Sequence, residues 1–182
     1  YGQLYNAAAE TGRLSLRFFD VALDVDVWRE ELAEYAPDTI VASPKILRIL
    51  AETTTLPLVN VFSGAEVLDP LDRQIVEAAF GTKAREIYMA TEGLFGVACE
   101  HGTLHLAEDV VAFEWEAVPD SDLLMPLVTD FTRSTQIMAR YRMNDLLRLS
   151  SKPCACGSPL QAVECVEGRQ DDVFKLHGAN GL

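Results

Sequence analysis

Hydrophobic and polar positions follow two different periods along the first half of the chain. Short apolar runs of strand length are each followed by a stretch in which apolar residues recur three or four positions apart, the spacing of one helical face. Alternation at these lengths is typical of βαβ units and predicts a largely parallel sheet covered by helices. The expected strands lie at residues 14–20, 38–43, 56–63 and 84–90, and the expected helices at residues 26–37, 43–52 and 69–81.

Residues with strong preferences for helix ends mark the first and third of these helices. Asp69 is expected to cap the third helix, and Pro70 suits its first position because the missing N–H costs nothing there. Gly81 suits the left-handed residue after its end, and Asp26 is the expected cap of the first helix. The predicted core-facing residues are Leu71, Ile75, Val76 and Ala79 in the third helix and Val27, Leu32 and Tyr35 in the first.

The sequence beyond about residue 93 changes to short apolar runs with no convincing helix between them. Consecutive short strands favour an antiparallel meander or barrel packed beside the α/β part. The predicted fold class is α/β: a layered βαβ sheet at residues 1–93, a β-rich subdomain at 94–167 and a polar, glycine-rich segment at 168–182. The strands expected in the β-rich part lie at residues 94–99, 103–108, 110–118, 124–131, 136–142, 145–150 and 160–166.

Composition and charge narrow the classes of function. The 182 residues are 49% hydrophobic and 24% charged, as in an ordinary globular protein with a proper core. A net charge of -13 argues against a surface that binds nucleic acid, yet it permits a small anion held by a few local donors. No apolar run approaches the roughly 20 residues of a membrane span. Four cysteines fit a reducing compartment better than a disulfide framework, which predicts a cytoplasmic protein.

One chemically suggestive segment ends a predicted strand at residues 88–93, Tyr-Met-Ala-Thr-Glu-Gly. In open α/β sheets, ligands bind beyond the carboxyl ends of the strands, where the flat ring of Tyr88 can meet a flat ligand. Thr91 can hydrogen-bond a phosphate, and Glu92 can hold a magnesium ion that bridges phosphate oxygens. The plain alternative is a strand end with a solvated glutamate.

Three further segments carry weaker signals of the same kind. At residues 62–70, small residues let the backbone approach a ligand closely, or simply form a turn into the next helix. At residues 139–147, Asp145 can accept two hydrogen bonds from a ribose diol, or serve only as a turn residue. Gly168, in the segment 167–175, suits a hinge, or an ordinary surface loop.

In order and spacing, these segments resemble the motifs of the adenylate-forming superfamily of acyl-activating enzymes. YMATE resembles its aromatic-x-x-Thr-Glu motif, SGAE its Gly-Gly-Glu loop, YRMND its Tyr-Arg-Thr-Gly-Asp motif, and GRQDDVFK its hinge. The segments EHGTLHLAEDV, TDFTR and PCACGSPL resemble phenylacetate–CoA ligases and, more closely, the branch related to deazaflavin-coenzyme adenylating synthetases. The resemblance extends over essentially the whole chain.

The resemblance implies attack of a carboxylate, an aryl or other acyl acid, on the α-phosphate of ATP, followed by transfer of the acyl group to coenzyme A. Tyr88 would stack on adenine, and Asp145 would hold the ribose hydroxyls. Glu92 would bind Mg²⁺, Thr91 would contact the phosphate, and Arg169 would lie near the same nucleotide. Asp171 would be the pivot of a rotating C-terminal domain. The residues implied to border adenine through their backbone are Ser63, Gly64 and Ala65.

The chain also departs from the pattern of this superfamily. Met89 and Asn144 stand where many relatives have glycine, and no Ser/Thr/Gly-rich phosphate loop appears. The C-terminal domain with its catalytic lysine is also missing, so we expect a central portion of a longer enzyme that is inactive by itself. The alternative is a nucleotide-binding or zinc-stabilised module without catalysis. The expected partner is a small-molecule acid, with a homodimer left open.

The cysteines indicate a metal site. Cys154 and Cys156 stand one residue apart at a predicted turn, and Cys99 with His105 supplies a second pair of ligands. Three cysteines and one histidine form an accepted structural zinc set. His101 is the competing nitrogen ligand, and the alternative is that the four thiols behave as small hydrophobic side chains. The remaining cysteine, at position 165, is expected in the core.

Overall fold

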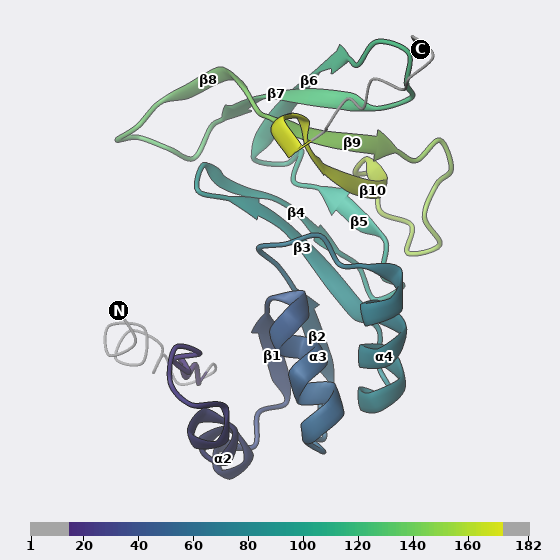
Figure 1. Ribbon diagram of the computed structural model, residues 1–182. Helices are drawn as coiled ribbons and strands as arrows, with labels where there is room; N and C mark the ends of the chain where they lie inside the picture. The colour runs from purple at the N-terminus through teal and green to yellow at the C-terminus, as the bar shows by residue number, and fades with distance from the viewer. Residues whose placement is uncertain (1–14, 173–182) are drawn as a thin grey trace, which may run out of the picture.

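The computed structural model describes residues 15–172 (Figure 1). Helices alternate with strands in its first half: α2 (Val25–Tyr35), β1 (Thr39–Ala42), α3 (Pro44–Thr53), β2 (Asn60–Ser63), α4 (Pro70–Phe80) and β3 (Ala84–Ala90). Strands alone follow: β4 (Gly93–Ala98), β5 (Leu104–Leu106), β6 (Val111–Ala117), β7 (Leu124–Asp130), β8 (Met138–Arg142), β9 (Asp145–Leu149) and β10 (Ala162–Arg169). A short 3₁₀ turn, η1 (Gln170–Asp172), ends the described part.

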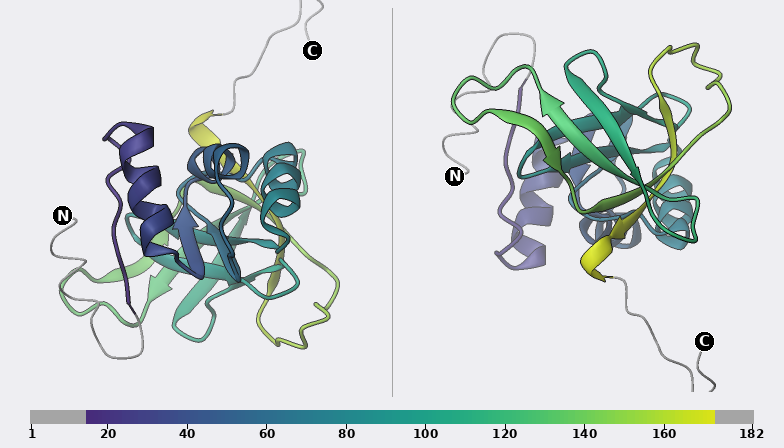
Figure 2. Two further views of the ribbon diagram at one scale, coloured as in Figure 1. Left: turned by 90° about the horizontal axis from the view of Figure 1, so that it is seen from below. Right: turned by 90° about the horizontal axis from the view of Figure 1, so that it is seen from above.

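The strands form one mixed sheet in the order β1-β2-β3-β4-β5-β10-β9-β7-β6, and β8 pairs with β7. The first three strands are parallel, as the βαβ pattern predicts, and β3 pairs antiparallel with β4 on its other side. The α/β fold class with a β-rich part is therefore confirmed. The β-rich strands also continue the first sheet directly, because β3 belongs to both parts. Figure 2 shows α3 and α4 side by side on one face of β1–β3.

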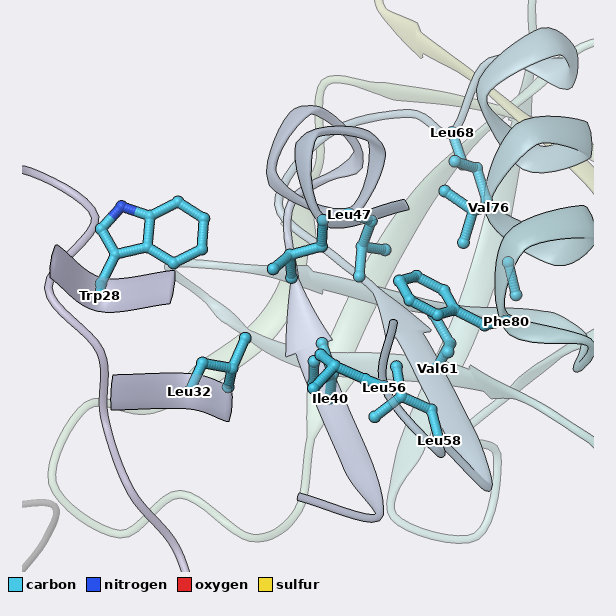
Figure 3. Packing of buried hydrophobic residues seen from close by; sticks show 12 residues of the cluster. Trp28, Leu32, Ile40, Leu47, Leu56, Leu58, Val61, Leu68, Val76 and Phe80 are labelled. Atoms are coloured by element: carbon cyan, nitrogen blue, oxygen red, sulfur yellow. The ribbon is translucent and has the colours of Figure 1, made fainter. Parts of the chain in front are cut away.

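Buried hydrophobic residues form two clusters, one in the α/β part and one in the β-rich part. The first packs α2, α3 and α4 against β1–β3 (Figure 3). The second lies within the β-rich part and includes Phe95 and Leu147, which are fully buried. Strand β3 contributes to both clusters, Ala84 to the first and Tyr88 to the second. The two ends of one strand are thus fixed by different cores.

The predicted core-facing stripes of two helices are partly wrong. In α2 the buried residues are Trp28 and Leu32, while Val27 is 47% exposed. In α4 the corresponding pair is Val76 and Phe80, and the predicted Leu71 is 56% exposed. In each helix the buried pair is spaced i, i+4. Leu32 and Val76 are thus buried as predicted, and the aromatic residues Trp28 and Phe80 are the buried residues that the predicted stripes omit.

The predicted helix ends are confirmed for α4 and shifted for α2. Asp69 Oδ1 accepts a hydrogen bond from the backbone N–H of Leu71 at 2.8 Å, and Gly81 has a left-handed φ of 67°. The cap of α2 is Asp24, not Asp26, because the Asp24 carboxylate accepts from the N–H of Asp26 at 2.9 Å. None of the helices in the described range combines the length and the apolar character needed to cross a bilayer.

Two strand predictions need correction. Residues 15–20 form no strand; Phe19 instead packs edge-on against Tyr35 of α2, with ring centroids 5.9 Å apart. The strand expected at 56–63 begins only at Asn60, where pairing with Thr39 of β1 begins. Residue 14 of the first prediction lies outside the described residues, as do residues 173–182 of the expected C-terminal segment.

Candidate functional site

A cleft of about 290 Å³ opens where the carboxyl ends of β2 and β3 meet β9 and β10. The parallel strands β2 and β3 end at the same edge of the sheet, the usual position for ligands in open α/β sheets. The start of β9 and the end of β10 complete the wall, since Asp145 and Arg169 are register partners across these strands. The residues that line the cleft include Ser63, Ala65, Tyr88, Met89, Asp145 and Arg169.

A buried hydrogen bond joins two sides of the cleft. The hydroxyl of Tyr88 donates to Asp145 Oδ2 at 2.8 Å, and each residue is 7% exposed. Burial, followed by the charge of Asp145, raises the pKa of Tyr88 well above its usual value, so that the phenol keeps its proton. The other oxygen of Asp145 lies 3.6 Å from Arg169 Nε. The ring of Tyr88 packs on Phe95 at a centroid distance of 5.5 Å.

The end of β2 contributes a polar atom and a strained backbone. The hydroxyl of Ser63 is buried, with the residue 1% exposed, and has no hydrogen-bond partner among residues 15–172. Ala65 has a φ of 71°, in the left-handed region that glycine prefers. Strain of this kind persists where the surroundings fix it and is concentrated at functional sites. Gly64, between them, does not line the cleft, but its nearest neighbours include Met89.

The turn after β3 lies just beyond the cleft. Ala90, the last residue of β3, lines the cleft, whereas Thr91 and Glu92 follow it outside the lining. Glu92 Oε1 accepts a hydrogen bond from the hydroxyl of Tyr141 at 3.3 Å. This tyrosine belongs to the YRMND segment, and the spacing of that segment does not indicate the contact.

The turn between β8 and β9 is tied to η1. The side-chain amide of Asn144 donates to the Asp171 carboxylate, and the carbonyl of Asn144 accepts from the backbone N–H of Gln170 at 2.8 Å. A glycine at position 144 would lack the first of these bonds. Asp171, the predicted pivot, therefore contacts the β8–β9 turn through the side chain of Asn144.

A second cluster of side chains lies away from the cleft. The structure brings together the four predicted metal ligands, Cys99, His105, Cys154 and Cys156, with their ligand atoms all within 4.8 Å of one another. Cys99 Sγ is 3.7 Å from Cys154 Sγ, and Cys156 Sγ is 3.4 Å from His105 Nε2. The competing ligand, His101, lies outside this cluster, and its Nε2 is 3.8 Å from Glu100 Oε1.

The chemistry of these four residues fits a zinc ion. His105 Nδ1 lies 3.0 Å from the carbonyl of Leu160, so an N–H on Nδ1 donates there and leaves Nε2 as a ligand atom. Hydrogen bonds from the backbone N–H of Cys156 and from Thr103 lower the pKa of Cys154 to about 6, which favours the thiolate that a metal requires. Cys165, expected in the core, is only partly buried, and its thiol contacts Glu167 at 3.2 Å.

The chain is similar in sequence and in fold to parts of several CoA ligases. No family model matches the chain. Phenylacetate-coenzyme A ligase of Thermus thermophilus is 26% identical over 168 residues, which cover 82% of this chain and 38% of that protein. An open conformation of 2-hydroxyisobutyryl-CoA ligase, in complex with 2-HIB-AMP and CoA, superposes with a TM-score of 0.68 at 21% identity and covers 82% of this chain and 40% of that one. A benzoate CoA ligase from Burkholderia xenovorans gives a TM-score of 0.61 at 18% identity, over 82% and 35% of the chains. The chain thus spans about two fifths of the length of these relatives.

Proposed function

From the premise that this chain is a distant homologue of phenylacetate–CoA ligase within the adenylate-forming superfamily, we propose that its cleft binds the adenosine part of ATP. The whole protein would then adenylate an acyl or aryl carboxylic acid. The observation that carries the proposal is that Ser63, Tyr88, Asp145 and Arg169 come from four strands and line one cleft. In the reaction, a carboxylate oxygen of the acid bonds to the α-phosphorus of ATP while the bond to pyrophosphate breaks. The thiol of CoA then takes the acyl group and releases AMP.

Asp145 is the group that would hold the ribose. An ionised carboxylate offers about four acceptor positions, and Tyr88 occupies one of them. The remaining positions suit the two hydroxyls of a ribose, while the Tyr88 bond keeps the carboxylate oriented. The hydroxyl of Ser63 would give its missing hydrogen bond to the base. Both groups are buried, so a ligand that satisfies them gains more than it would at an exposed site.

Magnesium would be held by Glu92 together with phosphate oxygens, because Mg²⁺ prefers carboxylate and phosphate oxygen ligands. The residues present fit this role: Glu92 is partly exposed, and Tyr141 occupies only one of its acceptor positions. The ion supplies charge neutralisation when an anionic acid approaches an anionic phosphate. Thr91 would donate its hydroxyl to the same phosphate, and Asp171 would remain the pivot for the thiol-transfer step.

Binding of AMP to the 182-residue chain, measured by isothermal titration calorimetry, tests this proposal. Ser63→Ala should weaken AMP binding by roughly 3- to 10-fold, the value of one neutral hydrogen bond, without lowering the melting temperature. Asp145→Asn should reduce the preference for AMP over 2′,3′-dideoxy-AMP, because the amide keeps only one acceptor oxygen. Ser121→Ala, at the exposed β6–β7 turn, is the control. It should change neither the affinity for AMP nor the preference for AMP over the dideoxy compound. Failure of the unaltered chain to bind AMP would overturn the proposal.

Catalysis by the parent protein is a separate question. A nucleotide-binding module without catalysis would bind AMP but give no ATP–pyrophosphate exchange with any acid, and a module that is only zinc-stabilised would do neither. An adenylating enzyme would give exchange in a full-length version and lose it in Glu92→Gln, while weak AMP binding survives. AMP binding should survive because the metal ion would bind the phosphate oxygens and not the adenine base. Unchanged exchange in Glu92→Gln would remove this residue from the mechanism.

We also propose that the cysteine–histidine cluster binds one structural zinc ion, because its four ligand atoms converge within 4.8 Å. The ion would join the β4–β5 hairpin to the loop before β10 and so stabilise the β-rich part. Metal analysis of protein purified without chelator should give one zinc per chain. Cys154→Ser should lose the zinc and melt at a lower temperature, whereas Cys165→Ser, which removes a thiol outside the cluster, should keep it. Zinc-free unaltered protein would contradict the proposal.

A further inference from the structure

A cationic side chain from the loop between β7 and β8 lies against the turn that follows β3. A Cβ atom added at Gly93 would lie 3.6 Å from Arg133 Nη2 and 3.6 Å from Asp130 Oδ2. The guanidinium is thus among the groups nearest to the side-chain position of Gly93, the residue next to Glu92. This arginine belongs to the TDFTR segment, and the family resemblance implies no role for it.

The arginine is held in place by an oriented carboxylate. Arg133 Nε lies 3.3 Å from Asp130 Oδ2. The other oxygen of Asp130 accepts from both the backbone N–H and the hydroxyl of Thr132, each at 2.7 Å. The hydroxyl bond, followed by the backbone bond, lowers the pKa of Asp130, and its side chain is 8% exposed. A fixed, charged partner of this kind orients the guanidinium and reduces the entropy lost when it binds a ligand.

The guanidinium keeps donors available for a ligand. Its ion pair with Asp130 uses Nε, and within residues 15–172 the terminal N–H groups have no hydrogen-bond partner. Its side chain is 27% exposed, enough for a ligand to reach it. Other cations near the cleft are engaged by acids: Arg73 pairs with Glu86, and Lys45 lies 3.6 Å from Glu66.

The charged side chains around the cleft are mainly acidic. The acidic residues of the cleft wall and the adjoining turn are Glu66, Glu86, Glu92, Asp145 and Asp172. Arg169 is the cation among the cleft residues, and it faces Asp145 at the ribose end. A nucleotide phosphate at the other end would meet mainly negative charge unless another donor lay beside the turn.

We propose that Arg133, on the β7–β8 loop, binds the phosphate group of the nucleotide beside the turn that carries Thr91 and Glu92. This inference rests on the proposed function, because it takes the nucleotide to lie in the cleft with its phosphate toward that turn. The planar guanidinium can give two parallel hydrogen bonds to phosphate oxygens, which a lysine cannot do. Arg133 would thus bring positive charge from the β7–β8 loop to the turn that follows β3.

The test compares AMP with adenosine, which has the same base and ribose but no phosphate. Dissociation constants are measured by calorimetry with the 182-residue chain and its variants. Arg133→Gln should weaken AMP binding roughly tenfold and leave adenosine binding within about twofold, because only the charge-assisted bonds are lost. Arg133→Lys should retain part of the affinity for AMP. Arg140→Gln is the matched control, since Arg140 lies on the adjoining strand β8 and pairs with Glu114 at 2.8 Å; it should change neither constant.

The possible results separate the inference from the function on which it rests. If the unaltered chain binds AMP and Arg133→Gln keeps the same ratio of AMP to adenosine affinity, the inference is wrong and the proposed function stands. Equal weakening of both ligands also overturns the inference, because it indicates a structural effect on the whole cleft. If the unaltered chain binds no AMP, both proposals fail.

Discussion

Removal of the Tyr88 hydroxyl tests how much the fold depends on the bond at the base of the cleft. Tyr88→Phe keeps the ring that packs on Phe95 and deletes only the donor to Asp145. The Asp145 carboxylate would then keep Arg169, 3.6 Å away, as its nearby charged partner. The Arg169 side chain is 59% exposed, so solvent screens that interaction and it compensates little.

The size of the effect follows from burial. A hydrogen bond to a charged group contributes about 1.5–3 kcal/mol, and the larger values apply where the group that loses its partner is buried. We expect Tyr88→Phe to lower the free energy of unfolding by about 2 kcal/mol. For a chain of this size, 1 kcal/mol corresponds to roughly 2–4 °C, so the melting temperature should fall by about 4–8 °C.

Thermal unfolding followed by circular dichroism measures this change, and Tyr141→Phe provides a matched control. The hydroxyl of Tyr141 also donates to a carboxylate, that of Glu92 at 3.3 Å, but Tyr141 is 46% exposed. Its removal should cost less than about 0.5 kcal/mol, because water replaces the lost donor. Equal shifts in the two variants would refute the argument that burial determines the strength of the Tyr88–Asp145 bond.

The titration of Tyr88, the packing at Gly96 and the Asn144–Asp171 hydrogen bond can each be tested separately. Burial and Asp145 raise the pKa of Tyr88 above 10.0 in the folded state. The free energy of unfolding should therefore not depend on this group below pH 10 and should fall above it, by up to about 1.4 kcal/mol per pH unit. In melting experiments between pH 9 and 11, Tyr88→Phe should lose this contribution to the pH dependence of stability. Gly96→Ala should lower the free energy of unfolding in urea by about 1–3 kcal/mol, because its Cβ would lie 2.6 Å from the carbonyl oxygen of His105. Gly64→Ala is the control: its Cβ would have no neighbour closer than 3.8 Å, so the free energy of unfolding should stay nearly unchanged. Asn144→Gly should speed amide hydrogen exchange in η1 by roughly 2- to 10-fold, because one hydrogen bond to Asp171 is lost; unchanged exchange would mean that this bond does not hold the turn.

The elements of the fold were predictable where local chemistry determines them. Asp69, Pro70 and Gly81 fix the ends of α4 by capping and backbone preference, which act within a few residues. The β-rich strands were also predictable, because their runs are short and separated by turns. The core-facing side of α2 was not, since its position depends on how Trp28 packs against distant strands. The strand predicted at residues 14–20 failed for a similar reason: an apolar, aromatic run forms a strand only where another strand is available to pair with it.

In the candidate site, too, the sequence predicts which residues take part but not the contacts between residues far apart in the chain. Motif resemblance identified Ser63, Tyr88, Asp145 and Arg169 before their positions were known, and they line one cleft. The sequence did not reveal that the Tyr88 hydroxyl bonds to Asp145, because the two residues are 57 positions apart. Nor did it reveal the place of Arg133, which depends on how the β7–β8 loop lies on the turn after β3. Contacts of this kind follow from sheet topology, which a short motif does not encode.

Strand β10 links the two candidate sites. At its start, Ala162 pairs with His105 of the metal cluster, and at its end Arg169 pairs with Asp145 of the cleft. Register shifts on β10, between Val163 and Cys165 and again between Val166 and Gly168, bring the strand end into line with Asp145. A bulged strand is weakly held by its own ladder, because each extra residue interrupts the pairing. A metal ion bound at the cluster would fix the start of β10 and so help to set the register on which the position of Arg169 depends.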